Sequence, residues 1–150
     1  MYSKEQSSKL RQQFWTKFGQ YMKPVPGAGE EPVNWLNYKT GKRNISFHMN
    51  ADQQQATIVI EIKHKDNTER ETCYNQFFYL KKLMENQTGF AWQWEKDMIT
   101  ESGQLISSIY QILQPVNVMN ENDWQAIISF LKPRIIALDS FWQLVKDGFE

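Results

Sequence analysis

Glu61 and Lys63 stand two positions apart in the run 57–63, which reads TIVIEIK. Its β-branched residues and its alternation predict a strand with three isoleucines on the buried face. Because strand side chains alternate, Glu61 and Lys63 share the other face. A carboxylate can hold Mg²⁺ or Mn²⁺, and a neighbouring ammonium can stabilise developing charge. The pair is therefore a candidate for metal-assisted chemistry.

Such a site needs a second carboxylate, and the neighbouring predicted strand does not supply one. The residues that share the Glu61 face there are Asn44, Ser46, His48 and Asn50. The nearest upstream acid is Asp52, in the turn 51–55. We expect it to lie well over ~10 Å from Glu61, because much of the intervening chain is extended strand. The metal site is thus half present in the sequence.

Basic residues gather in the same region. Between positions 39 and 65 the chain has five basic residues and two acidic ones, although the whole chain balances 17 against 17. Basic groups among amides and an aromatic suit phosphate contact and base stacking. The alternative is an ordinary charged sheet surface protected against edge pairing. The candidate binding residues are Trp35, Lys39, Lys42, Arg43, His48 and Lys63.

Other reactive residues are few. Ser46, His48 and Glu61 share a predicted face, but no nucleophile elbow frames the serine, so polar residues on a solvated face explain the pattern better. Two histidines and one cysteine do not make a zinc site. Cys73 falls in the apolar stripe of a helix, where a thiol is a small inert hydrophobe, and a single cysteine fits a reducing cytoplasm.

The elements that carry these residues follow the order helix, three strands, helix, two strands, helix. Ser3 caps the first helix and Pro24 ends it. Strands 36–39 and 42–50 are predicted to form a hairpin around Thr40-Gly41, with Leu36 facing Ile45, and strand 57–63 follows.

The second half of the chain alternates between helix and strand. A second helix begins at Asp66 or Thr68 and ends at Gly89. Strand 90–95 follows, and residues 105–112 are a fifth strand or, alternatively, a short helix. The last helical region starts at Asn120 or Asn122, and Pro133 either kinks it or begins a second helix.

This order predicts a single α/β (α+β) domain over residues 1–150. We expect a mixed sheet of about five strands that includes an antiparallel three-strand meander, with helices on its apolar face. No apolar run is long enough for a membrane span. The predicted core is Phe14, Phe18, Leu36, Ile45, Phe47, Ile58, Ile60, Ile62, Phe77, Leu80, Ile128, Leu131 and Leu138.

Three stretches resemble a bacterial and archaeal domain-of-unknown-function family, the one numbered 4268. They are RQQFWTKFGQYMKPVPG, VNWLNYKTGKRNISFHMNAD and FLKPRIIALDSFWQLVKDGFE. The resemblance implies a cytoplasmic prokaryotic protein, sometimes appended to larger proteins with nuclease-like parts. It assigns no catalytic residue. The order of elements is also similar to the core of the PD-(D/E)XK nuclease superfamily, which implies metal and catalytic roles for Glu61 and a catalytic role for Lys63.

We therefore expect a non-catalytic binding module with a restriction-endonuclease-like fold and no required cofactor. It would contact nucleic acid or a protein partner through the polar face of its sheet, and association with a second copy is left open. The alternative is a nuclease of the PD-(D/E)XK type that uses Mg²⁺ or Mn²⁺ with Glu61 and Lys63.

Overall fold

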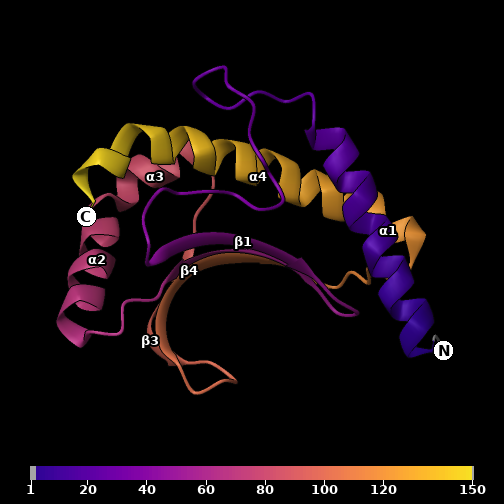
Figure 1. Cartoon of the computed structure of the whole chain (residues 1–150), viewed down its shortest axis with the longest axis horizontal. Coiled ribbons are helices and arrows are strands. Elements are labelled where there is room, and N and C mark those ends of the chain that lie inside the picture. The colour runs from indigo at the N-terminus through magenta and orange to yellow at the C-terminus, as the bar shows by residue number, and fades with distance from the viewer. Residues whose placement is uncertain (1–2, 150) are drawn as a thin grey trace.

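A computed structural model describes residues 3–149 of the chain (Figure 1). In chain order the elements are α1 (Lys4–Met22), β1 (Ile45–Ala51), β2 (Ala56–Ile62), α2 (Asn67–Tyr79), α3 (Lys81–Thr88), β3 (Gln93–Ile99), β4 (Leu105–Leu113), the 3-10 turn η1 (Glu121–Asp123), α4 (Trp124–Val145) and the 3-10 turn η2 (Lys146–Gly148).

The four strands form one curved sheet in the order β1-β2-β4-β3, and every neighbouring pair is antiparallel. Helix α4 runs along one face of the sheet, while α1 and α2 lie at its opposite ends (Figure 1). The other face is left without a helix in the part of the chain that the structure describes. The architecture is therefore mixed α and β, as expected.

The core lies between the sheet and α4. The alternation in β2 is confirmed, because Ile58, Ile60 and Ile62 are fully buried. Every predicted core residue is buried except two. Leu80 is half-buried at the break between α2 and α3, and Leu36 is 44% exposed.

The predicted hairpin around Thr40-Gly41 is wrong. Residues 36–39 form no strand, and β1 begins only at Ile45. The sheet has four strands rather than about five, it is antiparallel rather than mixed, and the three-strand meander reduces to the β1–β2 hairpin. Leu36 lies against α1, where a Cβ built on Gly19 would come within 3.1 Å of Leu36 Cδ1.

Residues 23–44, here called the strap, do not join the sheet, because α4 offers them polar partners. The strap crosses α4 (Figure 1). The buried Asp139 carboxylate accepts hydrogen bonds from Tyr38 Oη and from the Ala28 N–H, the latter at 2.8 Å. Trp142 Nε1 donates to the Thr40 carbonyl at 2.8 Å. Burial, followed by the contact with Asp139, raises the pKa of Tyr38 above its ordinary value. The bonds to the Ala28 N–H and to the Thr40 carbonyl satisfy backbone groups that have no partner in a β-sheet.

The predicted helix ends are mostly confirmed. Ser3 and Gln6 form the capping box of α1, and Asp66 caps α2 by accepting the Glu69 N–H at 2.9 Å. The second predicted helix is divided into α2 and α3, and Gly89, at φ 75°, ends α3. One continuous α4 contains Pro133, which decides between the two alternatives.

Replacing Asp139 by alanine leaves the Tyr38 hydroxyl and the Ala28 N–H without their buried acceptor. We expect Asp139→Ala to lower the free energy of unfolding by about 2–4 kcal/mol, measured by urea unfolding. Asp139→Asn keeps one acceptor oxygen and should cost less. The exposed Asp147→Ala is the control. A value for Asp139→Ala equal to that control would contradict the anchoring role of this carboxylate.

Candidate functional site

The loop before β1 is held rigidly by Thr40. Its Oγ1 accepts the Lys42 N–H at 3.1 Å and donates to the Ile45 carbonyl at 2.7 Å. Gly41 between them has φ 78°, a backbone conformation that side-chain-bearing residues rarely adopt. The loop therefore presents Lys42 and Arg43 at the entrance of β1 in a fixed arrangement.

A backbone hydrogen bond continues the β1–β2 pairing beyond the end of β2. The Lys63 N–H donates to the Asn44 carbonyl at 2.8 Å. This bond places the residues that follow β2 beside the loop that precedes β1, although the two segments are far apart in the chain. Arg43 and Lys63 consequently line one cleft, together with Lys65.

Two adjoining clefts surround these cations at the end of the molecule where α2 lies. The larger, of about 710 Å³, lies between the loop and α2, and the smaller, of about 580 Å³, lies at the start of α2. They share Arg43, Asn44 and Glu69. We call the two together the basic groove. Its cationic residues are Lys42, Arg43, Lys63 and Lys65.

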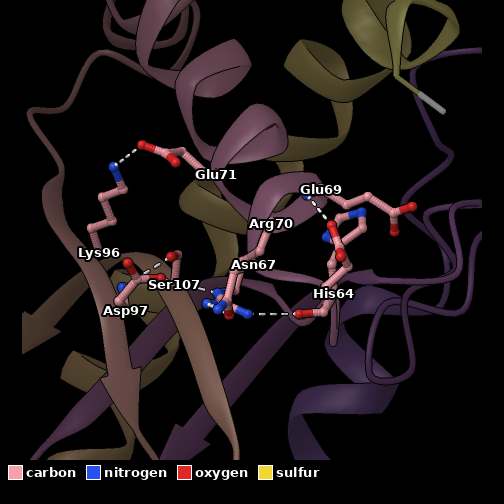
Figure 2. Close-up of polar contacts among 9 residues, drawn as sticks. His64, Asn67, Glu69, Arg70, Glu71, Lys96, Asp97 and Ser107 are labelled. Atoms are coloured by element: carbon pink, nitrogen blue, oxygen red, sulfur yellow. Dashed lines mark hydrogen bonds and ion pairs between the residues drawn. The ribbon is translucent and has the colours of Figure 1, made fainter.

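A buried arginine fixes the helical wall of the basic groove (Figure 2). Arg70 is 2% exposed. Its Nε donates to Asp97 Oδ1 at 3.0 Å, its Nη1 to the His64 carbonyl at 2.9 Å and its Nη2 to Asn67 Oδ1 at 2.7 Å. Asp97 sits in the β3 bulge with φ 56°, and its N–H donates to Ser107 Oγ. Each nitrogen of the guanidinium thus has an acceptor, and its charge is paired with Asp97, as burial requires.

The charge of the basic groove is positive but not uniform. Asp66 and Glu69 line it as well. The Asp66 carboxylate caps α2, so part of its charge is balanced by the helix N-terminus. Burial lowers the pKa of His64 below its ordinary value, which disfavours a positive charge on this ring. His64 Nδ1 is buried with no hydrogen-bond partner among the described residues. The lysines and the arginine therefore carry the positive field.

Cys73 forms part of the larger cleft but is 6% exposed. Burial raises the pKa of its thiol to about 12. The thiolate, which is the reactive form, is then scarce at neutral pH. The structure agrees with the sequence interpretation of Cys73 as an apolar core residue.

Three of the predicted binding residues do not reach the basic groove. Trp35 is 3% exposed, and its Nε1 donates to the Val25 carbonyl at 2.9 Å inside the strap. Lys39 is exposed on the strap, between two buried residues, rather than on a strand. His48 lies on the open sheet face. The expected placement of tryptophan and lysines together on a sheet face is wrong, because it depended on the hairpin that does not form.

On the open face, His48 Nε2 lies 3.0 Å from Glu61 Oε1. The hydrogen bond from His48 is the main reason why the pKa of Glu61 falls below its ordinary value, against the opposing effect of partial burial. Asp52 is at the far end of β1 and accepts the N–H groups of Gln54 and Gln55 in the turn. Glu61 and Asp52 are therefore apart, as expected.

Sequence reasoning missed a second carboxylate on the face of Glu61. Glu61 and Glu95 both pair with Ser108, from opposite sides of β4. Their backbones are about 9.5 Å apart, two strand spacings. Glu95 accepts from Tyr110 Oη at 2.5 Å. Among residues 3–149, no group of three or more His, Cys, Asp and Glu side chains is arranged to hold a metal ion.

The His48–Glu61 contact gives a pH prediction. We expect His48→Ala to raise the pKa of Glu61 toward its ordinary value, measured by ¹³C NMR titration of the carboxyl carbon. Because the folded pKa is depressed, the stabilisation exists above the unfolded pKa and is lost as pH falls through the folded pKa. Both side chains are partly exposed, so the loss is below about 1 kcal/mol. An unchanged titration of Glu61, as expected for the control Lys39→Ala, whose lysine does not contribute to the lowered pKa of Glu61, would contradict this role of His48.

The nuclease alternative gives a second prediction. We expect the parent to cleave plasmid DNA with Mg²⁺ or Mn²⁺ no more than the Glu61→Gln variant does. This variant keeps the shape of the side chain and removes the charge that a metal needs. Gel electrophoresis of the products measures the cleavage. Metal-dependent cleavage that Glu61→Gln abolishes would instead establish the alternative.

No described helix is long and apolar enough to cross a membrane.

Comparison with protein-family models agrees with the resemblance that the three sequence stretches indicated. Searches of curated proteins and of solved structures gave no significant match. A family model described as Domain of unknown function (DUF4268) matches residues 10–146, which is nearly the whole chain. The chain therefore belongs to the DUF4268 family.

Proposed function

We propose that this chain is a nucleic-acid-binding module that contacts phosphates through the basic groove. One observation carries the proposal. Four cations from two separate segments, Lys42 and Arg43 before β1 and Lys63 and Lys65 after β2, line two adjoining clefts at one end of the sheet. Lysine and arginine supply most of the affinity of proteins for the phosphate backbone.

The local character of the positive charge supports a specific surface. The chain as a whole has a formal net charge of zero, so long-range attraction of a polyanion to the entire molecule is weak. Asn44 lies among the cations and adds an amide that can bond to phosphate or sugar oxygens. The proposed surface lies at the end of the sheet rather than across its polar face.

Two further parts of the proposal concern chemistry and location. We propose binding without cleavage, which the contact between Glu61 and His48 supports, since the Glu61 carboxylate already has a partner. We also propose a cytoplasmic location, supported by a lone buried thiol that needs no oxidising environment.

Reversing two charges of the basic groove tests the proposal. We expect Arg43→Glu/Lys63→Glu to weaken binding of a fluorescein-labelled oligonucleotide by roughly tenfold or more at low salt, because two attractions to phosphate become repulsions. Fluorescence anisotropy at several salt concentrations measures it. The logarithm of the parent affinity should fall with the logarithm of salt by about one unit for each phosphate that the protein neutralises.

The matched control carries the same change in net charge elsewhere. Lys4→Glu/Lys23→Glu alters two exposed lysines near the ends of α1, at the opposite end of the molecule. We expect it to bind nearly as the parent does. Equal weakening by both pairs, or a parent that binds no oligonucleotide, would contradict the proposal. Capture of a protein partner with little salt dependence would favour the protein-binding alternative instead.

A further inference from the structure

The two walls of the basic groove differ in chemistry. The wall made by the segments around 41–44 and 63–65 carries the cations. The wall made by α2 carries hydroxyl and amide groups from Thr68, Thr72 and Gln76, all of which line the larger cleft. These three residues follow one another at four-residue spacing, so they form one stripe along the helix.

An exposed aromatic residue continues this stripe. Tyr79 follows Thr72 by seven residues, which is ~700° of rotation and ~10.5 Å of rise, so the two lie within ~20° on the helix surface. Tyr79 is 90% exposed, whereas its neighbour Phe78 packs edge-on against Trp94. The ring therefore extends into solvent at the C-terminal end of the helical wall.

A charged wall facing a polar and aromatic wall matches the needs of a single strand. Proteins that bind single-stranded nucleic acid combine a positive groove that follows the backbone with aromatic rings on which bases stack. From Asn67 to Tyr79 the helix runs ~18 Å, which is space for ~5 nucleotides at the ~3.4 Å rise of a stacked strand. A duplex keeps its bases stacked inside and cannot offer one to a ring at the end of a groove.

We propose that the basic groove takes single-stranded nucleic acid, with phosphates along the cationic wall and bases toward α2, one of them stacked on Tyr79. This inference rests on the proposed function and deepens it, because it names the strandedness of the ligand and the residue that senses its bases. Glu69, which lines both clefts, then faces the bases, where a carboxylate can accept from exocyclic amino groups.

Binding of three matched probes to the full chain tests the inference. The probes are a labelled 15-nucleotide oligothymidine, an abasic strand of the same length and a 15-base-pair duplex. We expect Tyr79→Ala to weaken binding of oligothymidine by roughly 5- to 150-fold, the range for removal of one stacked base. Tyr79→Trp should restore it, and the salt slope should not change, because the cations still meet the same phosphates.

The other probes and one further variant separate stacking from a structural role. Tyr79→Ala should not affect binding of the abasic strand, and the parent should bind the duplex more weakly than oligothymidine. Tyr21→Ala removes a half-exposed tyrosine from α1 and should bind as the parent does. A strand carrying 5-iodouracil should photocrosslink to Tyr79 and not to Tyr21.

The outcomes distinguish this inference from the proposed function. If Tyr79→Ala binds oligothymidine as the parent does, or weakens the abasic strand equally, or if the parent prefers the duplex, the inference is wrong while the role of the cations stands. If the parent binds none of the three probes, both are wrong.

Discussion

A guanidinium can be buried only where several fixed acceptors surround it, and Arg70 meets this requirement with three segments at once. Its partners are the Asp97 carboxylate of the β3 bulge, the His64 carbonyl after β2 and the Asn67 side chain at the start of α2. The first turn of α2 therefore cannot move relative to the sheet without leaving a charge unpaired. This one side chain thereby holds the segment that follows Lys63 and the helical wall of the basic groove to each other.

A second buried polar side chain does the same for the opposite wall. Asp139 holds the strap on α4, and the Trp142 ring of the same helix donates its N–H to the Thr40 carbonyl. Thr40 in turn fixes the loop that carries Lys42. The positions of Lys42 and Arg43 thus depend on polar interactions made deep in the core by α4. A loop backbone held in this way loses little freedom on binding, so more of each attraction to phosphate is available as affinity.

The open face of the sheet has a different character. His48 with Glu61 and Tyr110 with Glu95 form two polar pairs on the same face. Positive charge is concentrated at the end of the sheet, and carboxylates occupy its middle. A polyanion would therefore meet repulsion from these two glutamates across the open face and attraction at the basic groove. For this reason the proposed binding surface lies at the end of the sheet.

Local pattern determined much of this protein from its sequence. The isoleucine alternation of β2, the capping box at Ser3, the Asp66 cap and the apolar stripe of α4 each follow from interactions within a few residues. The association of Lys42, Arg43 and Lys63 was also predicted, although on the wrong surface.

Only the tertiary structure decided the conformation of residues 36–39, the burial of Trp35 and Arg70, and the sharing of one face by Glu61 and Glu95. The alternating pattern at 36–39 suits a strand, but Asp139, which is distant in the chain, supplies a buried acceptor that the strap meets instead. Such partners are far away in sequence, and a strand's local pattern contains no information about them.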